Sequence, residues 1–252
     1  MGEKGEGSVS SLKKMLSILD LFNEERSTVH FDEIIKELNV SVPTGYRYLK
    51  ELCDSGLLAK TAGSSYIIGP KIIKLDRQIR TTDPIITKAK DIMKKLVEVS
   101  GCEVYLSNIY NDEILNVHSE SPTEKTYASY SRGKPHPIYL GATSKIILAH
   151  LSKARLKKIY DEYKKEITET GLGENWKEFQ SKLNEWKKNG YCVTHGELTK
   201  GVTGIAAPVF YNEQIIGSLT LIVPSSRLDV FNVDKLIELV KEAAATISIK
   251  SE

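Results

Sequence analysis

Apolar residues recur at helical spacing near the start of the chain. One stripe, with steps of three and four residues, consists of Leu12, Met15, Leu16, Leu19 and Phe22. This pattern predicts an amphipathic helix that buries one face. A second, shorter helix is predicted between an N-cap at Asp32 and an end near Asn39, because aspartate is a favoured N-cap residue. The residues that it is expected to bury are Ile34, Ile35 and Leu38.

A third helix is predicted to begin after a very short connection. Ser41 is its expected N-cap, and Pro43 falls in the first turn, where the missing N–H loses no intrahelical hydrogen bond. Its predicted buried stripe consists of Gly45, Tyr48, Leu49 and Leu52. The rest of its surface carries Val42, Pro43, Thr44, Tyr46, Arg47 and Lys50. A short helix, a tight turn and a further helix make up a helix-turn-helix.

The segment after the third helix predicts a hairpin. Residues 57–60 and 66–68 are strand-like, and the loop between them contains Gly63, Ser64 and Ser65, which tolerate tight turns. Three helices followed by such a hairpin form a winged helix-turn-helix. The sequence therefore predicts this domain over residues 1–69.

The outer face of the third helix has the chemistry of a DNA-reading surface. Arg47 can donate two hydrogen bonds to guanine O6 and N7 in the major groove. Further candidate contacts to phosphates or base edges, from the helix and from the tip of the wing, are Pro43, Thr44, Tyr46, Lys50, Lys60 and Thr61. The alternative is a polar helix face that is simply solvated. A hairpin that follows the third helix at the distance typical of a winged helix-turn-helix favours DNA binding over a merely solvated face.

The remaining chain alternates between helical and strand-like patterns. A basic, mildly amphipathic linker is predicted over 70–82, and Asp83 is expected to cap the helix that opens the domain 83–252. Further helices are predicted over 85–99, 141–151, 154–167, 175–190 and 233–247. Strands are predicted over 102–110 and 113–120, with additional strands between 190 and 226 and a turn at Asn212 and Glu213. Antiparallel strands with helices on one or both faces predict an α+β domain of the sensor type.

The first part of the chain resembles the DNA-binding half of the IclR family of transcription regulators. The resemblance covers "SLKKMLSILDLFNEE" and "FDEIIKELNVSVPTGYRYLKELCDSGLLAKTAGSSYIIGPKIIKL". The matching positions are Thr44, Arg47, Leu49, Tyr66 and Gly69. Lys14 stands where the family usually has arginine, and Pro43 replaces the usual serine, which removes a hydroxyl contact to phosphate there. The resemblance implies that the linker helix joins two domains and that its apolar side helps to pair protomers.

The second part of the chain is similar to the effector-binding domain of the same family, whose fold is related to GAF and profilin-like sensors. The similar segments are "RGKPHPIYLGATSKIILAHL" and "GYCVTHGELTKGVTGIAAPVFYNEQIIGSLTLIVP". The matching positions are Gly133, Lys145, Gly190, Tyr191, Glu197, Gly201, Ile205, Ala206, Ala207 and Pro208. Together the similarities cover nearly the whole chain.

The resemblance also implies which side chains face a small-molecule effector. Family members that bind small organic acids surround the ligand with an aspartate, a cysteine and two strand serines. Here those places are filled by Thr194, Gly204, Thr220 and Ile222. The loss of an acid and a thiol, together with the added apolar surface and space, predicts a bulkier, less acidic or partly aromatic ligand. Backbone N–H groups at Gly141, Ala142 and Thr143 are expected to attract a carboxylate, because helix N-termini attract anions.

Composition narrows the functional classes without choosing among them. With 252 residues and 40% hydrophobic content the chain is long enough for one large domain or two ordinary ones, and a net charge of +2 neither requires nor excludes nucleic acid. No apolar run reaches the roughly 18 residues of a membrane helix, and the N-terminus lacks a secretory signal, so we expect no membrane partner and a cytoplasmic protein. The distant Cys53, Cys102 and Cys192 predict reduced, structural thiols.

Catalytic and metal-binding motifs are not found in the sequence. The histidines considered as ligands are scattered and lack metal spacing: His118, His136, His150 and His195. His195 and Glu197 are expected on the same face of a strand, where His195 either contacts a ligand or senses pH, or is exposed or structurally bonded. The charge-rich segment 153–168 is interpreted as a solvated helix face. The aromatic and apolar residues at helical spacing, interpreted as packing positions, are Trp176, Phe179, Leu183 and Trp186.

The sequence thus predicts a sequence-specific transcription regulator without cofactors. Two or four protomers are expected on a quasi-palindromic double-stranded operator, with affinity set by a small-molecule effector. One alternative is a ligand sensor whose front half has become a protein-interaction module, which the apolar Val42 and Pro43 would suit. The other is an enzyme that acts on the small molecule. Whether binding represses or activates, and whether the protein is a dimer or a tetramer, stays open.

Overall fold

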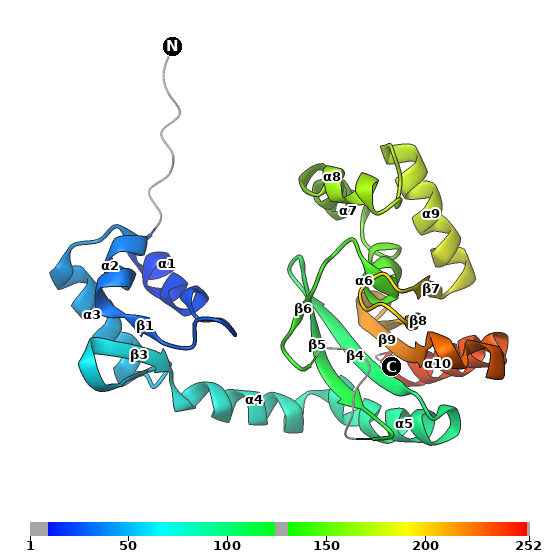
Figure 1. Cartoon of the computed structure of the whole chain (residues 1–252), viewed down its shortest axis with the longest axis horizontal. Helices are drawn as coiled ribbons and strands as arrows, with labels where there is room; N and C mark the ends of the chain where they lie inside the picture. Colours follow the sequence, from blue (N-terminus) through cyan, green and yellow to red (C-terminus); the bar gives the residue numbers. More distant parts are fainter. Residues whose placement is uncertain (1–9, 124–130, 251–252) are drawn as a thin grey trace, which may run out of the picture. The chain divides into compact units, whose positions relative to one another are not determined.

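A computed structural model describes residues 10–123 and 131–250 of the chain, which divide into two compact units, one ending at Thr82 and the other beginning at Asp83 (Figure 1). The first unit contains the elements α1 Ser11–Leu16, the 3₁₀ turn η1 Ser17–Leu21, β1 Val29–His30, α2 Phe31–Leu38, α3 Val42–Asp54, β2 Leu58–Lys60, η2 Ala62–Ser64, β3 Ser65–Ile68 and α4 Pro70–Thr82. Its strands form a small antiparallel sheet in the order β1-β3-β2. The predicted helices and the wing hairpin are confirmed.

The first helix differs from the prediction in the face that it buries. Leu12 and Leu16 are 67% and 50% exposed, whereas Ile18 is completely buried. The cause is the change from α-helix to 3₁₀ helix at Ser17, because three residues per turn point different side chains inward. The predicted burial of Leu12 and Leu16 is therefore wrong.

The start of α2 also differs from the prediction. His30, not Asp32, is the N-cap residue, and its N–H donates to the Glu33 carboxylate at 2.7 Å. His30 is also the last residue of β1, a strand that was not predicted and that pairs Val29 with Tyr66. The predicted end of the helix is confirmed, since Asn39 adopts a left-handed conformation with φ of 48°.

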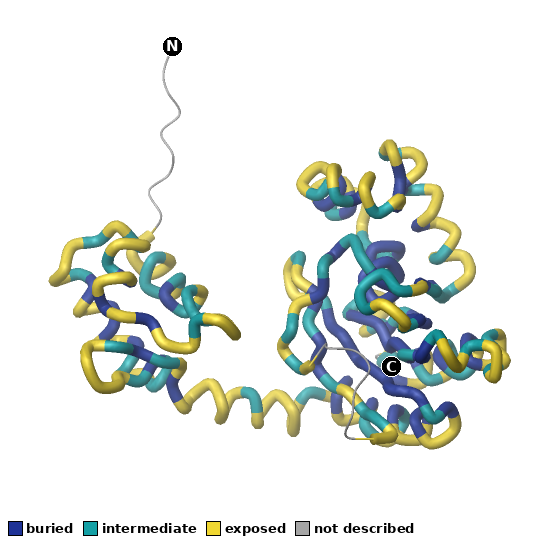
Figure 2. The backbone as a smooth tube through the Cα atoms, viewed as in Figure 1, coloured by how far each residue is buried: buried dark blue, intermediate teal, exposed yellow. Residues whose placement is uncertain are grey.

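The buried stripe of α3 is confirmed. Gly45, Tyr48, Leu49 and Leu52 are buried, and the larger three join a core that also receives side chains from α2 and the wing. A Cβ at Gly45 would lie 1.9 Å from the end of the Ile35 side chain, so a glycine here lets α2 and α3 approach closely. By contrast, α4 buries no residue, as Figure 2 shows.

The second unit is an α+β domain, as predicted. Its helices are α5 Pro84–Ser100, α6 Gly141–Leu148, α7 Lys153–Glu162, α8 Lys164–Glu169, α9 Trp176–Asn189 and α10 Val233–Ile247. Its strands are β4 Glu103–Tyr110, β5 Glu113–Glu120, β6 Pro135–His136, β7 Cys192–His195, β8 Val202–Tyr211 and β9 Gln214–Pro224, followed by the turn η3 Ser225–Val230. The strands form one antiparallel sheet in the order β6-β5-β4-β9-β8-β7. Strand β6 and η3 were not predicted.

Strand alternation divides this sheet into two faces. On β9, Leu219, Leu221 and Val223 enter the core that α5 and α10 cover. Thr220 and Ile222 point to the opposite face, because successive side chains of a strand point to opposite sides. Helix α6 covers that face (Figure 1). Asp83 caps α5 as predicted, accepting from the N–H groups of Ile85 and Ile86.

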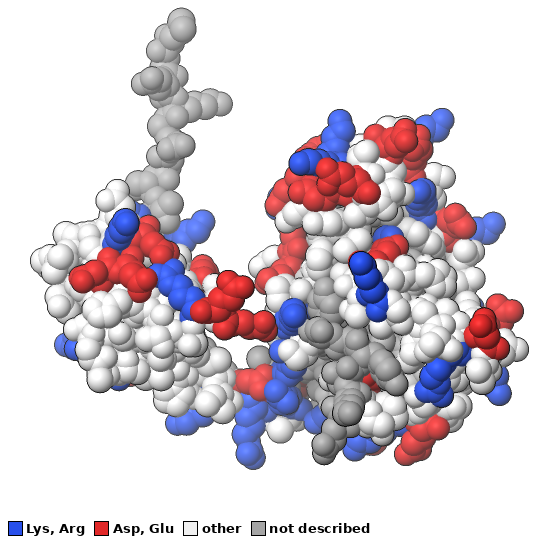
Figure 3. Space-filling view, in the orientation of Figure 1, with Lys and Arg blue, Asp and Glu red and all other residues white. Residues whose placement is uncertain are grey.

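The helices α7 to α9 form a second core with the outer face of α6. Phe179 and Leu183 are buried there, and Trp176 and Trp186 pack against them, so the packing interpretation is confirmed. Acidic and basic side chains lie next to one another over this helical region in Figure 3, as expected for a solvated surface. Within the described ranges 10–123 and 131–250, no helix is both long and apolar enough to cross a membrane.

Candidate DNA interface and ligand pocket

Residues of α3 opposite its buried stripe form the candidate DNA interface. Val42 and Tyr46 are 52% and 53% exposed, and Pro43, Arg47 and Lys50 are exposed as well. Arg47 and Tyr46 therefore do not turn into the interior. The first turn contains no acidic residue, which removes one source of repulsion toward phosphate.

Thr44 is partly engaged within the helix. Its hydroxyl lies 2.9 Å from the Ser41 hydroxyl, and its side chain is half-buried. Ser41 makes no side-chain hydrogen bond to the helix backbone, although it stands at the predicted N-cap position. The two hydroxyls thus bond one another at the start of α3.

Tyr46 is held in place by an aromatic stack. Its ring lies 4.1 Å from the ring of Phe31, centroid to centroid, at an interplanar angle of 23°. Phe31 is 6% exposed and begins α2, so the first helix of the motif supports a side chain of the second. A large exposed ring with a fixed orientation loses little side-chain entropy when it is covered.

The wing presents polar groups at an exposed tip. Lys60 and Thr61 are both exposed, and Thr61 donates from its N–H and its hydroxyl to the Ser65 carbonyl at 2.8 and 3.2 Å. Gly63 and Ser64 make the turn with φ of 71° and 61°. Among residues 58–68, Lys60 is the residue with a positively charged side chain.

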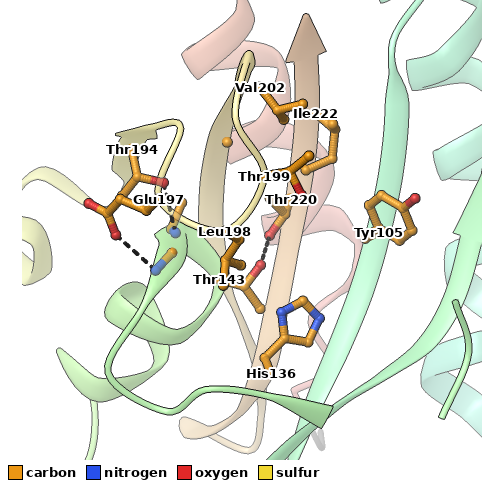
Figure 4. Close-up of a pocket in the computed structure, with 13 residues that line it drawn as sticks. Tyr105, His136, Thr143, Thr194, Glu197, Leu198, Thr199, Val202, Thr220 and Ile222 are labelled. Carbon is orange, nitrogen blue, oxygen red and sulfur yellow. Dashed lines mark hydrogen bonds between the residues drawn. The ribbon is translucent and has the colours of Figure 1, made fainter. Parts of the chain in front are cut away.

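A pocket opens on the α6 face of the second sheet (Figure 4). Its wall includes every predicted effector residue: Ala142, Thr143, Thr194, Gly204, Thr220 and Ile222. Residues that complete the wall are Tyr105, His136, Gly141, Glu197, Leu198, Thr199 and Val202. Together with its mouth the pocket encloses about 470 Å³ of empty space. A space of this order is typical of sites for small organic molecules.

The N-terminus of α6 is already occupied by oxygen atoms of the protein itself. The Gly141 N–H donates to Glu197 Oε2 at 2.9 Å, and the Ala142 N–H donates to the Thr194 hydroxyl at 3.1 Å. These groups were expected to attract a ligand carboxylate. In this conformation a ligand would have to replace Glu197 or Thr194 to reach them.

Glu197 also neutralises a buried cation. Lys145 Nζ lies 2.5 Å from Glu197 Oε1, and the Lys145 side chain is only 6% exposed. The ammonium stands 5.6 Å from the centre of the Trp186 ring, which adds a cation–π contact. A buried ammonium is tolerated because it is paired in this way.

The other polar groups of the pocket are neutral. The hydroxyls of Thr143 and Thr220 bond one another at 2.8 Å. Burial lowers the pKa of His136 to about 4, which keeps the imidazole uncharged near pH 7. Tyr105 donates its hydroxyl to Glu103 at 3.0 Å, and its pKa is raised by burial and by that carboxylate. Apart from Glu197, the pocket wall thus combines apolar surface with neutral polar groups.

His195 and Glu197 do not share a face, which corrects the prediction. Strand β7 ends at His195, and Gly196 turns the chain with φ of 65°. His195 is exposed and bonds the Thr203 hydroxyl at 3.0 Å, whereas Glu197 lines the pocket. Among the residues of the described ranges, no group of three His, Cys, Asp or Glu side chains is arranged to hold a metal ion.

Comparison with protein families decides the identity. The model of the IclR C-terminal domain of bacterial transcriptional regulators matches residues 78–249, and the model of the IclR helix-turn-helix domain matches residues 11–62. The chain belongs to the IclR family. The resemblance inferred from the sequence is therefore confirmed, and so is the combination of an N-terminal DNA-binding domain with a C-terminal α+β effector domain.

IclR-family relatives align along almost the whole chain. The regulators XynR and KdgR of Escherichia coli are each 26% identical to it, over 95% and 98% of this chain and 96% and 94% of their own lengths. An IclR regulator from Alicyclobacillus acidocaldarius shares the fold with a TM-score of 0.77 and 22% identity, over 95% of this chain and 98% of that one. A homologue from Microbacterium hydrocarbonoxydans, solved with 4-hydroxybenzoate, has a TM-score of 0.72 and 17% identity over the same shares. The relatives are named as regulators of transcription, not as enzymes.

Sequence reasoning about this IclR-family protein missed Tyr105 and His136 as pocket residues. Both come from strands that reach the pocket only through the order of the sheet: β4 lies beside β9, and β6 lies at the edge beside β5. Alternation along β4 places Tyr105 on the opposite side from the core residues Val104 and Leu106. The sequence contained that signal, but not the pairing with β9 that brings the strand to the site.

Proposed function

We propose that this protein regulates transcription by inserting α3 into the major groove of an operator while the wing contacts the phosphate backbone. In this proposal Arg47 contacts a base edge. The residues that contact phosphates or base edges are Lys50, Lys60 and Thr61, and those that lie against the groove beside Arg47 are Val42, Pro43, Thr44 and Tyr46. The observation that carries this proposal is the exposed α3 face, with Arg47 and Tyr46 directed outward and a hairpin beside it.

We further propose that the pocket binds a small organic effector, for which aromatic acids are the leading candidates. The apolar Val202 and Ile222, together with the Tyr105 ring, suit a flat hydrophobic body, and the Thr143 and Thr220 hydroxyls offer hydrogen bonds. The homologue solved with 4-hydroxybenzoate supports this choice of class. The effector changes operator affinity only to the extent that it binds the DNA-bound arrangement of the protein and the DNA-free arrangement with different affinities.

The proposed assembly is a homodimer or homotetramer in the cytoplasm. A single helix-turn-helix contacts too little DNA for tight binding, so paired protomers on a quasi-palindromic site are expected. Partly exposed apolar side chains on α4 are available for the contact between protomers.

Binding to DNA from upstream of the encoding gene tests the regulator. We expect Arg47→Ala to weaken binding by about 1–3 kcal/mol and to relax preference at one base pair, and Lys60→Ala to weaken binding to all sequences alike. In the Lys60 variant, the slope of the logarithm of the binding constant against the logarithm of the salt concentration should become smaller by about one unit. Unchanged affinity and base preference in Arg47→Ala would refute the role of that residue.

The same binding assay separates the alternative of a protein-interaction module, which the exposed Val42 and Pro43 favour. Such a module would show only weak, salt-labile binding that no single base change affects. The effector is tested by thermal denaturation with a panel of aliphatic and aromatic acids, since a ligand that binds the folded state raises the melting temperature. A genuine effector must also change operator affinity at the same concentration.

A further inference from the structure

Val42 is an apolar residue in an unusual place. It is the first residue of α3, it is 52% exposed, and it does not belong to the core that the rest of the helix joins. The next residue, Pro43, is exposed and has no N–H to offer to an acceptor. The leading turn of the reading helix therefore presents hydrocarbon where hydrogen-bond donors would suit phosphate contacts.

The surroundings of Val42 favour DNA as the partner that covers it. Tyr46 lies one turn further along the same side of the helix, and its ring is fixed against Phe31. Arg47 and Lys50 are exposed on the same helix, and its first turn has no acidic residue. A protein surface that is basic around a small apolar tip is complementary to the major groove, whose walls are anionic and whose floor is partly apolar.

Only one base offers a matching group. The major-groove edge of thymine carries a C5 methyl group beside its O4 acceptor, and adenine, guanine and cytosine have no methyl group there. The N-terminal residues of a recognition helix are those that contact base edges. We infer that Val42 is a specificity-determining residue that packs against a thymine methyl group in each operator half-site. This inference rests on the proposed DNA-binding function and explains the apolar surface that would otherwise favour a protein partner.

Replacing thymine by deoxyuridine tests the inference, because it removes the methyl group and leaves the hydrogen-bonding edge intact. Binding sites are first selected from a random duplex library with the full-length protein. Each thymine of a selected site is then changed singly to deoxyuridine, and the dissociation constant is measured. We expect one thymine in a half-site at which the wild type loses about fourfold in affinity, which corresponds to about 0.8 kcal/mol for one buried methyl group.

Variants assign that methyl contact to Val42. At the responsive position, Val42→Ala should bind thymine and uracil sites almost equally, whereas Val42→Ile should keep the preference. Val230→Ala is the matched control, since Val230 is 82% exposed in the other unit and should preserve the full thymine preference. The ratio of the dissociation constants for the uracil and thymine sites does not change when a variant loses affinity for all DNA equally.

Failure of this inference is distinguishable from failure of the regulator. If the protein selects sites and requires Arg47, but Val42→Ala discriminates uracil from thymine as the wild type does, the role of Val42 is overturned. The same holds if no thymine responds to the substitution. If the wild type selects no sequence at all, the DNA-binding function fails and this inference fails with it.

Discussion

At the scale of single residues, the pairing of Lys145 with Glu197 shows how a charge is held away from water beside the pocket. The ammonium has almost no solvent contact, whereas the Glu197 side chain is 27% exposed. Glu197 serves a second partner, because it also accepts from the Gly141 N–H. Removal of Glu197 therefore leaves two donors without an acceptor, whereas removal of Lys145 leaves a carboxylate that still accepts one hydrogen bond.

This asymmetry predicts different costs for the two truncations. Glu197→Ala leaves a buried ammonium and a buried N–H without their acceptor, and should lower the free energy of unfolding by about 3 kcal/mol. Lys145→Met leaves a half-solvated carboxylate that keeps one donor, and should cost about 1 kcal/mol. Urea unfolding followed by tryptophan fluorescence measures both, since Trp176 and Trp186 lie in the same unit. Glu169→Ala, which breaks an exposed pair, is the control; equal losses for the two buried variants would contradict the prediction.

At the scale of elements, the wing depends on a close approach between two backbone segments. The Gly69 N–H donates to the Leu57 carbonyl at 2.8 Å, and the Lys71 N–H donates to the Gly56 carbonyl at 3.1 Å. A Cβ on Gly69 would lie 2.2 Å from the Gly56 carbonyl oxygen. Only glycine fits between the base of the hairpin and the start of α4 without moving the backbone.

Gly69→Ala should therefore destabilise the first unit by about 3 kcal/mol, because the backbone must shift to relieve the overlap. Gly63→Ala in the same hairpin is the matched control. Its φ of 71° is strained for alanine, but a Cβ there meets nothing within 4 Å, so a cost of about 1 kcal/mol is expected. Hydrogen exchange of the wing amides in the full-length protein measures both. Similar protection in the two variants would show that the close approach is not required.

At the scale of the whole molecule, the proposed function needs paired protomers, and α4 carries an apolar stripe that could form the contact between them. Ile72, Leu75 and Ile79 recur at three- and four-residue steps and are 36%, 42% and 46% exposed. Ile73 is 74% exposed but lies on the other side of the helix. An apolar stripe of this kind suits contact with a second copy of the chain.

Lysine substitutions on α4 test this proposed contact. Ile79→Lys should shift the protein toward monomers in sedimentation equilibrium and weaken operator binding at least tenfold, because a monomer contacts a single half-site. Ile73→Lys adds the same charge outside the stripe and should leave both properties unchanged. If the Ile73→Lys variant became monomeric, or if the Ile79→Lys variant stayed oligomeric, the contact between protomers would not lie on this stripe.

The sequence by itself determined most of the helices and the longer strands, but not β1, β6 or η3, and it separated the buried from the exposed side of α3. Helical spacing in α3 distinguished the buried Gly45, Tyr48, Leu49 and Leu52 from the exposed reading face, because one helix repeats its environment every turn. Similarity to family patterns identified strand positions that the structure brings into one pocket. These signals are local, since each is contained within one element.

The tertiary structure alone decided which of these elements meet. The pairing of β4 with β9 joins segments about a hundred residues apart and brings Tyr105 to the pocket, and the turn at Gly196 sends Glu197, not His195, to the N-terminus of α6. The burial of Ile18 in place of Leu12 and Leu16 followed from a 3₁₀ turn that packing favours over the helical repeat. Periodicity describes the surroundings of one element, whereas the partners of a residue depend on contacts between distant segments that no single element encodes.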